Sequence, residues 1–200
     1  AGDYASKYSV EYVIKEIKEN HFKTPIGILE NAIHKASDAL LSEAKEKDGL
    51  EGMGTTFVAA VVYDKTMYVA NIGDSRLYVI HKDRMKQITE DHSLVEEMIK
   101  TGEIERKDSR HHPNKNIITR ALGTQKYISP DYFEVSIKKG DLILMCSDGL
   151  SNMLDDTEML NIIKESGDDI AHAGHKLVEK ANEYGGNDNI AVILIKPFDQ

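Results

Sequence analysis

The sequence has little sulfur chemistry and no long apolar run. Its single cysteine, Cys146, excludes an internal disulfide and is compatible with a reducing cytoplasm. No stretch of about eighteen consecutive apolar residues is present, which argues against a membrane span. No charged segment precedes an apolar one in the manner of a secretory signal. We therefore expect a cytoplasmic protein with no membrane partner.

Positive charge is also scarce. The chain has 25 Lys and Arg against 34 Asp and Glu, a formal net charge of −9 and a pI near 5.4. Nucleic-acid binding needs clustered basic residues, so no nucleic-acid partner is expected. An acidic field suits substrates with flanking Lys or Arg. With 200 residues, 40% of them hydrophobic, the chain is predicted to form one domain over residues 1–200.

Two amphipathic helices are predicted at the start of the chain. Apolar residues recur at helical spacing from Val10 to Ile17, where Ser9 is a plausible N-cap. A second apolar face runs from Ile26 to Leu40, after Thr24-Pro25 as N-cap and first helical residue. Both patterns predict helices with one buried face.

The remainder of the chain consists of separate blocks of strand patterns and helix patterns. We expect strands over 57–63, 67–72, 77–81 and 85–89 to form an antiparallel meander, because their connections are short. Further strands are predicted over 117–121, 132–137, 141–146 and 190–196, and helices over 93–100, 157–165 and 169–184. Segregated strand and helix blocks predict an α+β fold with antiparallel sheets.

Two aspartates stand at the ends of apolar runs. Asp148 lies in Ser147-Asp148-Gly149-Leu150, and Asp188 lies in the segment Gly185 to Ile190. Two such carboxylates brought together form the hard oxygen site that Mg²⁺ or Mn²⁺ prefers. Ser147 and Asn189 are then candidates to orient the ligands through hydrogen bonds. The alternative is two ordinary turns, since Asp-Gly is a common turn signal.

Other polar residues have two interpretations each. Arg120 can meet a phosphate bidentately or pair with Asp74 or Glu90 inside the fold. His92 can protonate a leaving group, although loop histidines are more often solvated. Cys146 is followed by no phosphate-binding loop and no Gly-x-Ser-x-Gly elbow is present, which leaves a metal-activated water as the nucleophile.

Six short motifs occur along the chain in a distinctive order. They are Gly54-Thr55-Thr56, Gly73-Asp74-Ser75-Arg76-Leu77-Tyr78, Thr89-Glu90-Asp91-His92-Ser93, Ile118-Thr119-Arg120-Ala121-Leu122-Gly123, Ser147-Asp148-Gly149 and Gly186-Asn187-Asp188-Asn189. In this order the chain resembles the bacterial form of the PP2C-type metal-dependent serine/threonine protein phosphatases. The resemblance covers nearly the whole chain.

The resemblance implies a β-sandwich of two antiparallel sheets flanked by helices, in an α-β-β-α order. It implies hydrolysis of phosphoserine and phosphothreonine in proteins with two to three Mn²⁺ or Mg²⁺ ions, and a cognate Ser/Thr kinase as the source of the substrates. Asp148 and Asp188 match ligand positions, and Asp91 matches the position of a further, weaker metal. Asp91 can equally be an N-cap before Ser93. Residues 102–116 match the flap beside the active site.

The resemblance also implies that the fold is incomplete at its N-terminus. Family members open with an Arg-x-x-Asn-Glu-Asp segment and an Asp-Gly-Met-Gly-Gly-His segment, and roughly the first forty residues of such a domain are missing here. A chain without them is expected to expose strand edges. The alternative function is therefore a catalytically inactive PP2C-like fragment or regulatory module that binds a phosphoprotein or partner.

Overall fold

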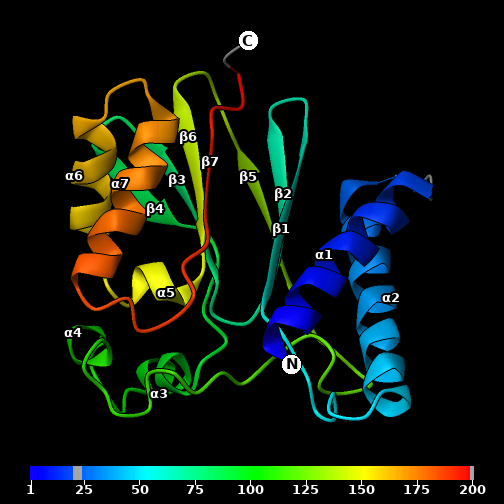
Figure 1. The fold of residues 1–200 in the computed structure, drawn as a ribbon. Helices are drawn as coiled ribbons and strands as arrows, with labels where there is room; N and C mark the ends of the chain where they lie inside the picture. The colour runs from blue at the N-terminus through cyan, green and yellow to red at the C-terminus, as the bar shows by residue number, and fades with distance from the viewer. Residues whose placement is uncertain (20–23, 199–200) are drawn as a thin grey trace. The chain divides into compact units, whose positions relative to one another are not determined.

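The computed structural model describes residues 1–19 and 24–198, which divide into two compact units. The first unit comprises residues 1–73 and 91–135, and the second comprises residues 74–90 and 136–200. Each unit contains one β-sheet and its own helices (Figure 1). Two antiparallel sheets flanked by helices were expected from the sequence, and this fold class is confirmed.

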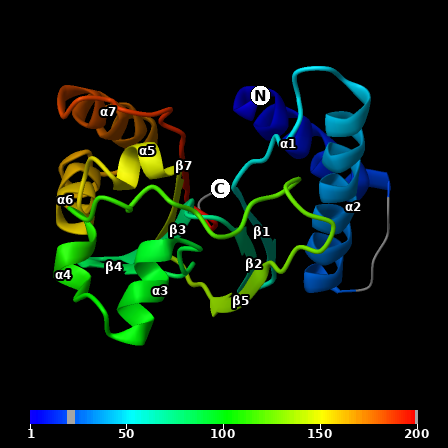
Figure 2. The same ribbon diagram turned by 90° about the horizontal axis from the view of Figure 1, so that it is seen from below.

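The first unit packs two long helices against a three-stranded sheet. The helices are α1 (Gly2–Glu19) and α2 (Pro25–Glu46), and the sheet has the order β1 (Phe57–Tyr63), β2 (Thr66–Ile72), β5 (Asp131–Ser136). The two helices lie beside each other in both views (Figures 1 and 2). Their buried faces meet strand residues in one apolar core, which includes Leu29, Ile33, Leu40, Phe57 and Ile72.

The start of α2 agrees with the sequence prediction, but the start of α1 does not. Thr24 caps α2 as expected, since its Oγ1 accepts a hydrogen bond from the Gly27 amide at 3.2 Å. The cap predicted at Ser9 is wrong, because α1 already begins at Gly2 and the buried Ser9 hydroxyl donates to the Ala5 carbonyl at 2.7 Å. Stacked rings of Tyr4, Tyr8 and Tyr12 continue the helical spacing through this region.

The second unit contains a four-stranded antiparallel sheet of order β4-β3-β6-β7. Its strands are β3 (Arg76–His81), β4 (Arg84–Gln87), β6 (Asp141–Cys146) and β7 (Val192–Ile195). The helices α6 (Asp156–Glu165) and α7 (Ile170–Glu183) cover one face of this sheet (Figure 1). All six residues of β6 are buried, which explains why its sequence lacks the alternation of a half-exposed strand.

The expected meander over residues 57–89 is wrong. β1 pairs with β2 and β3 pairs with β4, but β2 and β3 belong to different sheets. The chain leaves β2 at Gly73, whose φ of +103° is a conformation that favours glycine. Strand periodicity identified each strand, but it carries no information about which strands pair.

The strand expected over 117–121 is also absent. The backbone of this segment forms hydrogen bonds with residues 92 and 94 instead of with a neighbouring strand. The bridges here are isolated, and they join Ser93 to Ile118 and, just after the segment, Thr55 to Leu122. The short helix α5 (Asp148–Ser151) was not predicted.

Among the described residues, no helix is both long and apolar enough to cross a membrane.

The segment after Ser93 forms two helices. Ser93 caps α3 (Leu94–Thr101) as predicted, by accepting a hydrogen bond from the Glu96 amide at 3.2 Å. Residues 102–116, which match the flap of the family, contain the short helix α4 (Arg106–Ser109), and this helix lies beside α3 (Figure 2). We call residues 102–116 the flap.

Candidate metal centre

Asp148 is placed by the abrupt end of a buried strand. β6 ends at Cys146, Ser147 has extended backbone angles, and Asp148 is the first residue of α5. The Asn152 side-chain amide, one helical turn later, donates to Asp148 Oδ2 at 3.2 Å. The carboxylate is therefore oriented by its own helix at the end of the strand.

Ser147 brings the segment containing Asp188 to this strand end. Its Oγ donates to the Asn189 carbonyl at 2.9 Å and accepts from the Ala191 amide at 3.0 Å. The Ser147 amide donates to the Ala191 carbonyl at 3.1 Å. These three bonds connect two segments that lie about forty residues apart in the sequence.

Gly149 is required by the close approach of the same two segments. A Cβ at Gly149 would lie 2.3 Å from the Asn189 carbonyl oxygen and 3.3 Å from the Asp188 carbonyl oxygen. The first distance is far below van der Waals contact and the second is tight, so any side chain would displace the loop. The glycine of Ser147-Asp148-Gly149 is thus a packing requirement within α5.

The two carboxylates interact unfavourably with each other. Burial raises the pKa of Asp148, and the negative charge of Asp188 raises it further. The amides of Gly149 and Asp148 and the charge of Arg76 lower the pKa of Asp148, but they do not outweigh the first two effects. Asp188 is exposed, and its Oδ1 accepts from the Asn189 amide at 2.7 Å. We call Asp148 and Asp188 the carboxylate pair.

The carboxylate pair fits a divalent cation by its chemistry. Two oxygen ligands of like charge in a partly desolvated position are stabilised by a hard cation between them. Within the described part of the chain, no group of three His, Cys, Asp or Glu side chains is arranged to hold a metal. The second unit thus brings together two carboxylates that are candidate ligands, with Ser147, Gly149 and Asn189 in contact with their segments.

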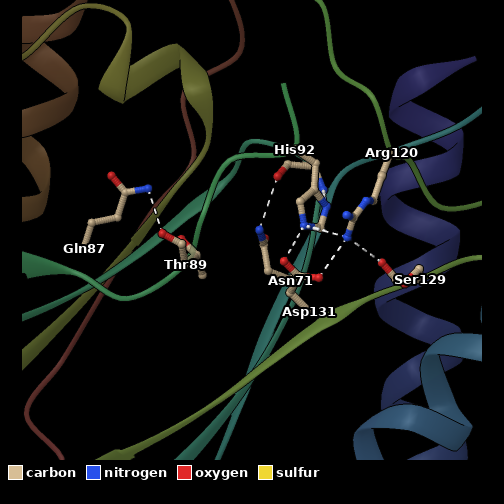
Figure 3. Close-up of polar contacts among 8 residues, drawn as sticks. Asn71, Gln87, Thr89, His92, Arg120, Ser129 and Asp131 are labelled. Carbon is tan, nitrogen blue, oxygen red and sulfur yellow. Dashed lines mark hydrogen bonds and ion pairs between the residues drawn. The ribbon is translucent and has the colours of Figure 1, made fainter. Parts of the chain in front are cut away.

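The remaining candidates lie in the first unit (Figure 3). His92 Nδ1 accepts a hydrogen bond from the Gly73 amide at 3.1 Å, and His92 Nε2 lies 3.1 Å from Asp131 Oδ2. Arg120 Nη1 donates to Asp131 Oδ1 at 2.8 Å and to the Ser129 carbonyl at 3.0 Å. We call His92, Arg120 and Asp131 the His92 cluster.

Asp131 is the carboxylate of the His92 cluster, and it contacts both His92 and Arg120. Burial alone would raise the pKa of Asp131, but hydrogen bonds from His92 and Arg120 and their charges lower it below its ordinary value. The sequence did not single out Asp131, because it lies in an unremarkable Ser-Pro-Asp-Tyr stretch. Asp91 precedes His92 in the sequence and is half-buried.

Arg76 and Asn152 are two further residues that sequence reasoning missed. Arg76 lies in the Gly73–Tyr78 motif, and its charge acts on Asp148. Its Nη1 donates to the Tyr78 hydroxyl at 3.1 Å, and this hydroxyl donates to Asp156 Oδ1 at 3.2 Å. For Asn152, the spacing of four residues from Asp148 was the available signal.

Comparison with known proteins shows to which family the chain belongs. The protein phosphatase 2C model matches residues 1–190. The serine/threonine phosphatase stp of Listeria innocua is 40% identical over 200 residues, which cover 98% of this chain and 79% of the relative. The chain belongs to the protein phosphatase 2C family.

Solved structures of this family share the fold of the chain. The serine/threonine phosphatase Stp1 of Staphylococcus aureus superposes with a TM-score of 0.91 at 34% identity, covering 97% of this chain and 77% of that one. The catalytic domain of the phosphatase PstP in complex with two manganese ions superposes with a TM-score of 0.85 at 27% identity, covering 96% and 80%. Metal dependence is typical of the protein phosphatase 2C family.

An ion pair joins the flap of this protein phosphatase 2C chain to α3. Arg106 donates to both carboxylate oxygens of Glu96, with distances of 3.0 Å from Nη1 and 2.6 Å from Nη2. The Glu96 side chain is 11% exposed and that of Arg106 is 69% exposed. This bidentate contact joins α4 to α3.

Proposed function

We propose that this chain is the catalytic part of a protein phosphatase that hydrolyses phosphoserine and phosphothreonine by means of a metal-activated water. The observation that carries the proposal is the carboxylate pair, held at one strand end by Ser147 and by the contact over Gly149. The family membership and the names of the relatives support the same reaction. They do not favour the alternative of an inactive binding module.

In this proposal Asp148 and Asp188 hold one Mn²⁺ or Mg²⁺ ion, and Asp91 contributes to a further ion. A bound divalent cation lowers the pKa of water and makes hydroxide available near neutral pH. The two carboxylates supply negative charge, and Asn152 orients the Asp148 oxygen through its amide. The Asn189 amide does the same for Asp188. Two to three ions serve the intact domain.

The proposal also includes the setting of the reaction. Phosphoproteins are the substrates, and a Ser/Thr kinase of the same cell supplies them in a cytoplasmic signalling cycle. The net charge of −9 favours association with substrates that carry Lys or Arg near the phosphorylated residue. The buried thiol of Cys146, which forms no disulfide, is compatible with the reducing cytoplasm.

The test is hydrolysis of phosphoserine and phosphothreonine peptides by the full-length protein with Mn²⁺, with Mg²⁺ and with a chelator. We expect phosphate release that depends on added metal and stops on chelation. A phosphotyrosine peptide of the same sequence serves as the specificity control. Metal-independent hydrolysis, or binding of the phosphopeptides without any turnover, would contradict the proposal.

A further inference from the structure

Arg76 lies at the end of the second unit's sheet at which Asp148 is placed. It is the first residue of β3, and it pairs across the sheet with Cys146, the last residue of β6. Asp148 follows two residues after Cys146 and begins α5. Because the two strands are antiparallel, the start of β3 and the end of β6 lie at the same end of the sheet.

The alternation of β3 determines the face on which the Arg76 side chain lies. Side chains two residues apart share a face of a strand, so Arg76 and Tyr78 lie on the same face. Tyr78 is fully buried in the core cluster that also contains Leu150 of α5 and Met159 of α6. Arg76 is half-buried at the end of this row, on the face of the sheet that packs against α5 and α6.

Two hydrogen bonds restrain the guanidinium of Arg76. The Tyr78 hydroxyl accepts from Arg76 Nη1 at 3.1 Å and donates to Asp156 Oδ1, at the start of α6, at 3.2 Å. Burial raises the pKa of Tyr78, so this hydroxyl keeps its proton at neutral pH and remains a donor to Asp156. The position of Arg76 is therefore restrained by groups that do not belong to the carboxylate pair.

The positive charge of Arg76 acts on Asp148. Burial and the charge of Asp188 raise the pKa of Asp148, and the charge of Arg76 acts in the opposite direction. A guanidinium and a divalent cation both stabilise a carboxylate, but they repel each other. An ion that binds to the carboxylate pair must therefore bind against the field of Arg76.

We infer that Arg76 is a counter-charge of the carboxylate pair, which stabilises Asp148 before a metal binds and limits the affinity of the pair for the divalent ion. The inference rests on the proposed function, because it takes the carboxylate pair as a metal site. A purely structural role, in which Arg76 only holds Tyr78 and Asp156, predicts lost stability with an unchanged metal affinity. The change in metal affinity therefore distinguishes the two roles.

The first experiment is Mn²⁺ titration of the full-length protein by isothermal calorimetry. Asp188→Asn identifies the part of the isotherm that belongs to the carboxylate pair. Arg76→Gln removes the positive charge, and Arg76→Lys keeps it. Lys139→Gln is the matched control, because it removes one positive charge at an exposed position before β6, at the opposite end of this strand from Asp148.

We expect Arg76→Gln to bind the ion of the carboxylate pair about three- to tenfold more tightly than wild type, since the repulsion is gone. Raising the salt to about 0.5 M NaCl should reduce this difference, because Arg76 is only half-buried and salt screens its charge. Arg76→Lys and Lys139→Gln should bind Mn²⁺ with the affinity of the wild type, because neither changes the charge beside Asp148.

The second experiment measures Tm in the presence of a chelator, and it needs neither metal nor activity. Arg76→Gln is compared in the wild-type and in the Asp148→Asn background. It should lower Tm less in the Asp148→Asn background, where residue 148 has no charge to stabilise. Ile163→Val is the control, because Ile163 is buried in the core of the same unit and should lower Tm equally in both backgrounds.

An unchanged or weaker Mn²⁺ affinity in Arg76→Gln would overturn the inference, and so would equal losses of Tm in the two backgrounds. Tightening of Mn²⁺ binding in Arg76→Lys would also overturn it, because hydrogen bonds of the guanidinium would then set the affinity. If Arg76→Gln does not fold, Arg76→Met decides the same comparisons, since it keeps an unbranched apolar stem without the charge.

The proposed function has a separate test. If wild-type hydrolysis depends on metal but Arg76→Gln binds Mn²⁺ like wild type, the inference fails and the proposed function stands. If the wild-type protein shows no metal-dependent hydrolysis, the proposed function fails. The comparison of Tm in the two backgrounds would in that case still decide whether Arg76 stabilises Asp148.

Discussion

The carboxylate pair and the His92 cluster are both built from ionisable side chains, but their charges are balanced in opposite ways. In the carboxylate pair, the negative charge of Asp188 adds to burial and raises the pKa of Asp148. In the His92 cluster, Arg120 and His92 surround Asp131 and lower its pKa. Two neighbouring negative charges that are not balanced by positive ones favour the binding of a cation from solution. A cluster whose negative charge is balanced by its own basic side chains instead holds backbone segments together.

The largest expected effect comes from removing one charge of the carboxylate pair. Asp188→Asn in the full-length protein should reduce Mn²⁺-dependent hydrolysis of a phosphopeptide by more than about a thousandfold, because the nucleophile depends on the ion. Steady-state kinetics at matched Mn²⁺ concentrations measure the loss. Asp48→Asn, at an exposed turn, is the control and should keep full activity. Retained activity in Asp188→Asn would remove Asp188 from the site.

The second effect tests whether the pair depends on close backbone approach. Gly149→Ala places a Cβ 2.3 Å from the Asn189 carbonyl oxygen. The displaced loop should weaken Mn²⁺ binding by about tenfold or more and lower the free energy of unfolding by about 1–3 kcal/mol. Calorimetry and thermal unfolding measure the two quantities.

Gly174→Ala is the matched control, because its Cβ would lie 3.9 Å from the nearest atom, Leu194 Cδ1. This glycine is inside α7, where alanine should stabilise the helix by about 0.5–1 kcal/mol. Equal behaviour of the two alanine variants would show that the contact at Gly149 is not needed to form the site.

A smaller effect is expected from the flap. Arg106→Ala removes the bidentate pair with Glu96 and releases α4 from α3. Deletion of residues 102–116 removes the flap entirely. Both changes should reduce activity on a phosphopeptide about three- to tenfold more than activity on a small aryl phosphate, since only the peptide extends beyond the phosphate group. An equal loss on both substrates would assign the flap to folding or metal binding.

The smallest effect concerns stability without metal. Because the pKa of Asp148 is raised in the folded state, the folded state retains this proton at higher pH than the unfolded chain does. Stability therefore falls as pH rises from the ordinary pKa of an aspartate through the raised value, and the cost is complete at neutral pH. Asp148→Asn removes that cost and should raise the metal-free Tm by about 2 °C, a small value because the group is partly exposed.

Differential scanning fluorimetry with a chelator at pH 7.5 measures this shift. The difference should shrink as the pH falls below the ordinary pKa of an aspartate, because the carboxyl is then protonated in the folded and the unfolded states alike. Added Mn²⁺ should reverse the order, since only the wild-type protein binds the ion through both carboxylates. A metal-free Tm that is lower in Asp148→Asn would contradict the unfavourable interaction between the two charges.

The sequence by itself determined most elements and both residues of the carboxylate pair. Apolar periodicity located α2 and all of β1 to β7 to within a few residues, and it found the second half of α1 but not its start at Gly2. Burial of one face determines the spacing of apolar residues directly. The turn chemistry around Asp148 and Asp188 marked the ends of two apolar runs. The order of the six motifs indicated the family.

Only the tertiary structure decided the pairing of strands and the partners of charges. Strands β2 and β3 are neighbours in sequence but belong to different sheets, and Asp131 became the partner of His92 and Arg120 from a position without any local signal. Local periodicity records whether a residue is buried, but it does not record which distant residue it meets. The contact over Gly149 has the same origin, since the steric requirement for glycine arises only when a segment forty residues away is packed against it.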